Sequence, residues 1–107
     1  MRFDAMAQLV VMYKAPTQPD AFDKHYFETH VPIAKKIPGL RKYEVNKGPV
    51  MTPGGPSGLH LIATLHFDDV AAIQRAFASP EGQAAAADVQ KFATGGVDML
   101  LFDTREV

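Results

Sequence analysis

The segment from Phe22 to Gly39 restricts the fold of this chain more than any other part of the sequence. Its largest side chains recur at spacings of four, four, three and four residues, a pattern that places them on the buried face of one helix. They are Phe22, Tyr26, His30, Ile33 and Ile37. Because a tyrosine and a histidine belong to this face, the helix forms either a core with polar members or the wall of a pocket.

Both ends of this helix, and a break within it, are predicted by prolines and a glycine. The sequence Thr-Gln-Pro-Asp at residues 17–20 combines a hydroxyl cap, an early proline and an acid in the first turn, which is typical of a helix start. Pro32 lacks a backbone N–H and crowds the carbonyl of Glu28, so we expect a kink or break near residues 30–31. Pro38-Gly39 then ends the element.

Four further segments carry the pattern of β-strands. We predict them over residues 7–14, 40–47, 59–67 and 97–102, because each is short and either mostly apolar or alternating. Alternation within residues 59–67 places His60, Thr64 and His66 on one face and the leucines on the other. Residues 48–58, rich in Gly and Pro, lead into a strand, so we interpret them as a loop and not as a dinucleotide-binding motif.

A second helix is predicted between the last two strands. Asp68-Asp69 would cap it, Ser79-Pro80 would restart it, and Gly95-Gly96 would end it. The order strand, helix, strand, strand, helix, strand, without a repeat or a boundary, predicts one domain over residues 1–107. We therefore expect the ferredoxin-like α+β fold, a four-stranded antiparallel sheet with helices on one face.

The apolar character of the first and last strands predicts a partner. Helices cover only one face of such a sheet, yet residues 7–14 and 97–102 carry apolar side chains on both faces. An uncovered apolar face of that size would promote aggregation. We expect the same face of a second copy to cover it in a homodimer.

Composition and charge exclude several classes of protein. A net charge of −1 without a Lys/Arg cluster argues against binding to nucleic acid or to an anionic membrane. No apolar stretch approaches the ~20 residues that span a bilayer, and the N-terminus lacks the pattern of a signal peptide. The absence of cysteine excludes disulfides, thiolate metal sites and cysteine nucleophiles, and it agrees with a cytoplasmic location.

The spacing of the four histidines argues against a metal site. His60 and His66 share a strand face but lie about 20 Å apart at ~3.3 Å per residue. His25 and His30, five residues apart, diverge by roughly 140° around a helix axis. We expect no metal and no tightly bound cofactor.

Acid–base chemistry is better supported. Tyr26 and His30 are four residues apart on one helix face, and an imidazole beside a phenol can transfer protons near neutral pH. The alternative, which the sequence favours, is a core histidine bonded to a backbone carbonyl freed by Pro32. Asp88 is either solvated or, if it faces inward, paired with a histidine of the neighbouring helix. Pairing with His30 would raise the pKa of the histidine.

A set of residues spread along the chain forms a further pattern. It consists of Phe22-Asp23, Tyr26, Thr29-His30, Pro32, Gly39, Glu44-Val45, Phe67-Asp68, Ala87-Asp88 and Phe92. Together these residues resemble the EthD family, named for the degradation of ethyl tert-butyl ether, over essentially the whole chain. The resemblance implies a dimeric α+β barrel in which two ferredoxin-like sheets face each other.

The resemblance leaves two classes of function open. Family members are often named oxidoreductases, and the fold also hosts cofactor-free monooxygenases, isomerases, polyketide cyclases and haem-handling enzymes. The first hypothesis is an enzyme that acts on a small apolar metabolite, aromatic or polyketide-like, by acid–base or redox chemistry in a chamber between two subunits. The second is a non-catalytic accessory protein that binds such a metabolite for a partner oxygenase.

The enzyme hypothesis assigns roles to residues at the family positions and on the third predicted strand. His30, Tyr26 and Asp88 would be catalytic. Phe92 would help to line the ligand chamber. His60, Thr64 and His66 would either line it as well or lie exposed near the strand ends.

Overall fold

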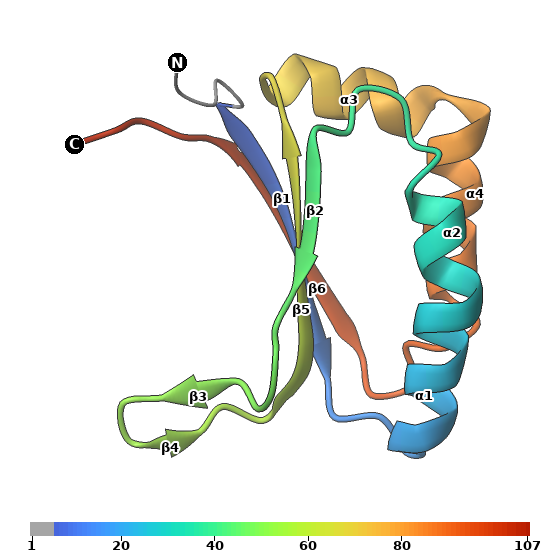
Figure 1. The fold of residues 1–107 in the computed structure, drawn as a ribbon, viewed down its shortest axis with the longest axis vertical. Helices are drawn as coiled ribbons and strands as arrows, with labels where there is room; N and C mark the ends of the chain where they lie inside the picture. The colour runs from blue at the N-terminus through green and yellow to red at the C-terminus, as the bar shows by residue number, and fades with distance from the viewer. Residues whose placement is uncertain (1–5) are drawn as a thin grey trace.

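Helices cover one face of a four-stranded antiparallel sheet and leave the other face open (Figure 1). The computed structural model describes residues 6–107. The sheet consists of β1 (Ala7–Lys14), β2 (Lys42–Val45), β5 (Leu59–Phe67) and β6 (Val97–Asp103), in the spatial order β2-β5-β1-β6. The helical elements are α1 (Pro19–His25), the π-helical η1 (Tyr26–His30), α2 (Val31–Ala34), α3 (Val70–Ala78) and α4 (Pro80–Val89). The predicted ferredoxin-like α+β class is confirmed.

The predicted strands agree with the structure except in the second segment and the loop after it. β1 and β5 have the predicted bounds, whereas β2 covers only the middle of residues 40–47. The segment rich in Gly and Pro is not a plain loop, because β3 (Met51–Thr52) and β4 (Gly55–Pro56) pair in a short hairpin. This hairpin projects to the side of the sheet opposite the helices (Figure 1).

The core lies between the sheet and the helices. Leu9 in β1 pairs with Leu65 in β5 and with Leu101 in β6. The buried side chains of β1 and β5 on this face are Ala7, Leu9, Val11, Tyr13, Leu61, Ala63, Leu65 and Phe67. Aromatic rings pack onto them, and the ring of Tyr13 lies between 5.4 and 5.7 Å from the rings of Phe22, Phe92 and Tyr26. The helix side of the sheet is therefore packed with aromatic rings around Tyr13.

The start of the first helix differs from the prediction. Gln18 occupies the cap position and makes no capping hydrogen bond with its side chain. The hydroxyls of Thr17 and Thr94 lie 3.3 Å apart, and the N–H of Thr17 donates to the Thr94 hydroxyl at 3.2 Å. Thr17 therefore connects the helix start to the loop before β6 and does not cap the helix.

Pro32 widens the first helix and does not end it. The N–H of Val31 donates to the carbonyl of Tyr26, five residues earlier, and η1 is the resulting π-turn. Pro32 has no N–H with which to continue the ordinary ladder, and a wider turn relieves the crowding by its ring. The irregularity predicted near residues 30–31 is present, and the chain is helical on both sides of it.

The second helical region begins and restarts at the predicted caps. Asp69 accepts a hydrogen bond at 2.7 Å from an N–H in the first turn of α3, and Ser79 accepts one at 3.0 Å from Gly82 in α4. Gly82 permits the sharp corner between the two helices, because a Cβ at this position would clash with the carbonyl oxygen of Ala76. The corner directs α4 along the first helix, where its side chains can reach the site.

The outer strand β6 exposes apolar side chains. Met99, Leu100, Leu101 and Phe102 are between 40% and 53% exposed. Leu100 pairs with Val10 and Phe102 with Gln8 on the face turned away from the helices. The apolar character predicted for both faces of this strand is therefore present. We refer below to the face of the sheet away from the helices as the open face.

Candidate active site

A cavity of about 70 Å³ lies between the sheet and the helices of one chain. Its wall is mainly formed by aliphatic side chains of β1, β5, α2 and α4. The lining residues that carry polar groups are Tyr13, Tyr26, His30 and Tyr43. The cavity that contains Tyr26 and His30 is lined by residues of a single chain, because this helix face covers the sheet of its own chain. The expected chamber between two subunits stays a prediction.

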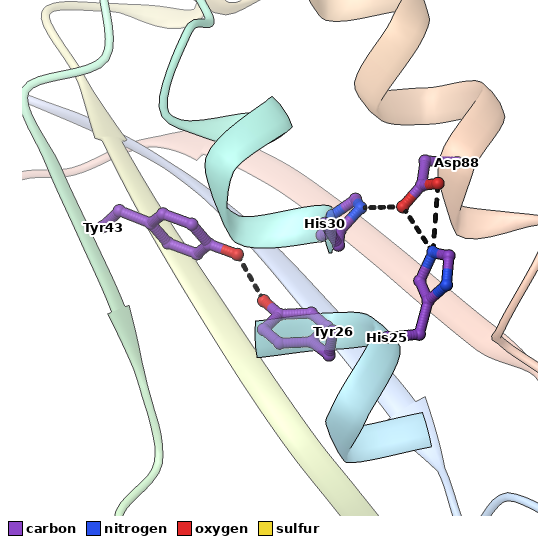
Figure 2. A network of polar contacts seen from close by, with 5 residues as sticks. All are labelled: His25, Tyr26, His30, Tyr43 and Asp88. Carbon is purple, nitrogen blue, oxygen red and sulfur yellow. Dashed lines mark hydrogen bonds and ion pairs between the residues drawn. The ribbon is translucent and has the colours of Figure 1, made fainter. Parts of the chain in front are cut away.

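Asp88 in α4 contacts two histidines of the neighbouring helix (Figure 2). Its Oδ2 lies 2.9 Å from Nδ1 of His30. Nε2 of His25 lies 3.1 Å from Oδ1 and 3.0 Å from Oδ2 of the same carboxylate. The side chains of His30 and Asp88 are 7% and 3% exposed, and that of His25 is 29% exposed. The predicted pairing of His30 with Asp88 is present, and Nδ1 is occupied by this carboxylate.

His25 is the member of this cluster that sequence reasoning missed. In an α-helix, residues five apart diverge by roughly 140°, so His25 and His30 are expected on different faces. The π-turn of η1 places one additional residue in the turn and brings both imidazoles to the side of Asp88. Pro32 is the signal in the sequence, because a proline that does not end a helix must change its hydrogen-bond ladder.

Phe92 supports the two imidazoles and does not line the cavity. Its ring centroid lies 4.9 Å from that of His30 and 5.1 Å from that of His25. Phe92 is buried, yet it is not part of the cavity lining. The role predicted for Phe92 in the ligand chamber is therefore corrected to one of packing behind the histidines.

Burial has the largest influence on the pKa of His30. Loss of solvation lowers the pKa of His30 below its ordinary value, although the hydrogen bond and charge of Asp88 act in the opposite direction, and the charge of His25 adds to the lowering. The predicted rise of the His30 pKa is thus wrong, because burial penalises the imidazolium more than the carboxylate stabilises it. We describe His30 as a neutral imidazole near pH 7.

Asp88 is the ionised member of the cluster. Burial acts to raise the pKa of Asp88, but the hydrogen bonds from His30 and His25 together outweigh it, and the pKa lies below its ordinary value. A carboxylate in this state accepts the Nδ1–H of His30, which leaves Nε2 of that ring without a proton. His30 is therefore held in the tautomer that can act as a base.

Two tyrosines form the second polar group of the cavity. The hydroxyl oxygens of Tyr26 and Tyr43 lie 2.5 Å apart (Figure 2). Burial is the main cause that raises the pKa of Tyr26, and it likewise raises the pKa of Tyr43, so both phenols keep their protons near pH 7. Tyr43 was missing from the predicted site. The feature that could have indicated this residue is a hydroxyl on the inward face of a short strand, because Tyr43 pairs with the buried Leu65.

His60 lies apart from the cavity for a local reason. The pairing of β1 with β5 shifts register between Tyr13 and Lys14, opposite the start of β5. Nε2 of His60 lies 2.7 Å from Oδ1 of Asp23, and the His60 ring packs 4.8 Å from that of Phe22. The prediction that His60 shares a face with the other polar residues of β5 is therefore wrong, since the irregularity turns it toward α1.

Thr64 and His66 lie on the open face of the sheet. Thr64 pairs with Val10 and Glu44 in the neighbouring strands, and Nε2 of His66 lies 3.0 Å from Oε1 of Glu44. Neither residue lines the cavity that contains His30. Of the predicted site residues, the structure thus brings together His30, Asp88 and Tyr26, and it leaves the three polar residues of β5 outside.

The part of the chain that the structure describes lacks the features of two other kinds of site. Within residues 6–107, no group of three or more His, Cys, Asp or Glu side chains is arranged to hold a metal ion. In the same part of the chain, no helix is both long and apolar enough to cross a membrane. The polar groups that face or adjoin the cavity are imidazole, carboxylate and phenol.

The fold and the site define a ferredoxin-like α+β protein with a buried histidine–carboxylate pair beside an apolar cavity. The chain belongs to the EthD family, because the EthD domain model matches residues 14–96. It is 42% identical over 102 residues to an uncharacterized 11.0 kDa protein in the thcB-thcC intergenic region of Rhodococcus erythropolis, which covers 95% of this chain and 98% of that protein. The resemblance predicted from the sequence is confirmed.

Solved structures of one EthD family protein and of two more distant proteins share this fold. An EthD family protein from Bacillus halodurans C-125 is 35% identical and has a TM-score of 0.83, over 95% of this chain and 99% of that chain. SnoaB, a cofactor-independent oxygenase from Streptomyces nogalater, shares the fold at 17% identity and a TM-score of 0.67, over 96% of each chain. A dimeric protein of unknown function from Bacteroides fragilis shares it at 20% identity and a TM-score of 0.62, over 95% and 99%.

Proposed function

We propose that the protein is an enzyme that removes a proton from a small, neutral, apolar metabolite in the cavity, with His30 as the general base. The observation that carries this proposal is the position of the His30 ring between Asp88 and the cavity. Nδ1 is bound by the carboxylate, so Nε2 is the ring nitrogen left for a ligand. A base held in this way contributes typically ~10²–10⁴-fold to the rate of proton transfer.

Asp88 orients the base and stabilises its charged form. A carboxylate bonded to Nδ1–H selects one tautomer and fixes the plane of the ring, as in other histidine–carboxylate pairs. When Nε2 of His30 takes a proton, the positive charge forms beside Asp88. The lowered pKa of His30 keeps the resting imidazole free to accept that proton.

The tyrosine pair is placed to bind an oxygen of the ligand. Tyr26 and Tyr43 have two hydroxyl hydrogens between them, and one of these is used in the bond that joins the pair. The other can be donated to a carbonyl or phenol oxygen in the cavity. As the carbon beside that oxygen loses its proton, negative charge develops on the oxygen, and one such donor is typically worth ~10²–10³-fold.

The cavity supports a neutral and largely apolar ligand. Its aliphatic and aromatic wall provides no charged side chain to pair with an ionised group, and an unpaired charge would lose its hydration there. A volume of about 70 Å³ is small beside the ~300–1,000 Å³ of typical ligand pockets, so it restricts an enclosed ligand to a compact molecule. A small aromatic compound with one polar oxygen comes nearest to both requirements, and a larger polyketide-like compound would have to extend beyond the cavity.

Removal of the proton leads to more than one outcome. The electron pair left on carbon can take a proton back at another position, which is an isomerisation. It can instead form a bond to molecular oxygen and give a hydroperoxide, which is the first step of an oxidation. The example of SnoaB supports such an oxygenase for this fold, and both outcomes need the same base.

The experiment that tests this function measures exchange of carbon-bound hydrogen with deuterated solvent. A panel of small neutral ketones and phenols is incubated with the protein in D₂O and followed by proton NMR. We expect exchange with the wild type and a loss of at least about 100-fold in His30→Gln. His66→Gln, a matched histidine substitution on the open face, should retain full activity.

A second function is separated by the same measurement. If a ligand of the panel binds, as seen by changes in its NMR line width, yet wild type and His30→Gln give equal exchange, the protein is a binding accessory and not this enzyme. The aliphatic wall of the cavity is the observation that favours that alternative.

A further inference from the structure

We propose that His25 is a positioning residue of the site, which holds the carboxylate of Asp88 from the solvent side and limits how strongly Asp88 can stabilise a proton on His30. Its effect on catalysis rests on the proposed function, whereas its effect on His30 does not.

The geometry shows two donors that share one acceptor. Nε2 of His25 lies 3.0 Å from the Oδ2 atom of Asp88 that also receives Nδ1–H of His30 at 2.9 Å. The contact of His25 with Oδ1, at 3.1 Å, makes it bridge both oxygens. The carboxylate of Asp88 is therefore held by one histidine on each side. It cannot rotate toward His30 without breaking its hydrogen bond with His25 (Figure 2).

His25 differs from His30 in its access to water. Its side chain is 29% exposed, against 7% for His30. It borders one open cleft with Lys91 and another with Lys24 and Glu28, so solvent reaches the ring from two sides. On its inner side it contacts Asp88 and the ring of Phe92. His25 thus connects the buried carboxylate to the surface.

The shared carboxylate couples the two imidazoles. Hydrogen bonding to His25 withdraws part of the negative charge of Asp88 from His30, and a positive charge on His25 opposes a second one on His30. The charged and titratable groups that face His30 are Asp88 and His25, with the phenol of Tyr26 packed against its ring at 5.2 Å. His25 is therefore the group best placed to adjust the basicity of His30 without touching the ligand.

Two substitutions separate the contributions of His25. His25→Gln removes the titratable imidazole and keeps an amide N–H that can donate to Asp88. His25→Ala removes both the titratable group and the donor, so the full charge of Asp88 becomes available to His30. Lys24→Gln is the control, because it removes a positive charge from the same surface without removing a hydrogen bond to Asp88.

The readout is the titration of the His30 ring nitrogens in protein labelled with ¹⁵N-histidine, without any ligand. We expect the titration midpoint of His30 to move to higher pH in His25→Gln and further in His25→Ala, and to stay unchanged in Lys24→Gln. Equal midpoints in the wild type and in His25→Gln and His25→Ala would overturn the proposal. Because His25→Gln retains the donor, the test stands even if His25→Ala does not fold.

A second readout connects the effect to activity. In the exchange assay, the acidic limb of the pH–rate profile should move to higher pH in His25→Gln by the same amount as the His30 midpoint, with ligand affinity unchanged. A shift of the NMR midpoint in a protein without exchange activity would support the role of His25 and contradict the proposed function alone. A rate profile that stays in place while the NMR midpoint moves would show that His25 does not position the base for catalysis, and it would overturn that part of the proposal.

Discussion

Two of the histidine–carboxylate pairs within residues 6–107 differ in their surroundings, and their comparison shows what burial adds. His30 and Asp88 are 7% and 3% exposed beside the cavity, whereas His66 and Glu44 on the open face are 14% and 52% exposed. The two N···O distances, 2.9 and 3.0 Å, are nearly equal. Geometry alone therefore does not distinguish the pairs, and solvation does.

The consequences of this difference appear in the titration of each pair. At the cavity, burial lowers the pKa of His30 in spite of its carboxylate. On the open face, the hydrogen bond from His66 lowers the pKa of Glu44, and water surrounds the carboxylate. In the single chain, an exposed carboxylate of this kind contributes little to folding, because water competes with His66 for it. The buried pair is costly to disrupt, since a group left without its partner cannot turn to water.

The largest effect is expected when the shared carboxylate is removed. Asp88→Ala leaves two imidazole donors without an acceptor in a buried layer, and it should lower the free energy of unfolding by about 3 kcal/mol. Urea unfolding measures this change. Glu44→Ala, which breaks the exposed pair, should leave the midpoint of urea unfolding unchanged. Equal losses of unfolding free energy in the two variants would show that burial does not distinguish the pairs.

A charge on the open face should have the next largest effect. We predict a homodimer through this face, and Ile62 lies on it opposite Met12 of β1. Ile62→Lys would place an ammonium group in an apolar interface, where burial of the isoleucine is worth roughly 1.5–3 kcal/mol. Sedimentation should show monomer or aggregate.

The matched control for the dimer adds a charge to the helix side. Glu28 is an exposed residue of η1, and Glu28→Lys should leave the sedimentation of the protein unchanged. A wild-type protein that sediments as a stable monomer at micromolar concentration would refute the dimer.

A smaller effect is expected at the tyrosine pair. Tyr43→Phe removes the partner of a buried hydroxyl and should lower the free energy of unfolding by about 1–2 kcal/mol. The exchange rate of a bound ketone should fall by roughly 10²-fold, because the donor to the developing negative charge is weakened. Tyr13→Phe serves as the comparison at another hydroxyl of the cavity wall, and an equal loss of rate there would mean that the pair has no special role.

The smallest effect is the dependence of stability on pH. The pKa of His30 is lower in the folded state than in the unfolded chain, so below the ordinary histidine value near 6.5 the unfolded chain binds a proton that the folded chain refuses. The free energy of unfolding should therefore fall as pH decreases below about 6.5, by at most ~1.4 kcal/mol per pH unit. The pKa of Asp88 is lowered, so this carboxylate stabilises the fold at pH values above the ordinary titration range of aspartate. Its contribution to stability is lost only when the pH falls below that range.

Urea unfolding at several pH values measures this slope. His30→Gln should flatten the dependence of the free energy of unfolding on pH between about pH 5 and 6.5. Glu44→Gln should leave this dependence unchanged in the same range, because carboxylates titrate at lower pH. A stability that rises on acidification through this range would show that Asp88, and not burial, controls His30.

The sequence predicted those parts of the fold and site that follow from periodicity. Alternation over β5 and the apolar run of β1 gave both strands their bounds, since a side-chain period of two depends on local pattern alone. The inward positions of Tyr26 and His30 followed from helical spacing in the same way. Asp88 could be named as the partner of His30 because a buried acid requires one.

The parts that failed depend on departures from regular geometry or on tertiary context. The register shift at the start of β5 places His60 on the helix side of the sheet. An alternating sequence pattern gives no indication of such a shift. The sign of the His30 pKa shift required the extent of burial, which a pairing alone does not give. Tyr43 lies on a short strand with one polar tip, and only the packed structure shows which group that tip meets.

The π-turn of η1 makes the site sensitive to the number of residues as well as to their kinds. A π-turn is equivalent to one extra residue inserted into an α-helix. If this segment kept its length but closed into regular α-helical turns, the two imidazoles five residues apart would diverge by roughly 140°. Every chemical group of the site would still be encoded, but one carboxylate could no longer bind both rings. In a regular helix the same pair of rings would need a spacing of four residues, so within relatives of this chain the length of this segment is informative about the site as well as the histidines.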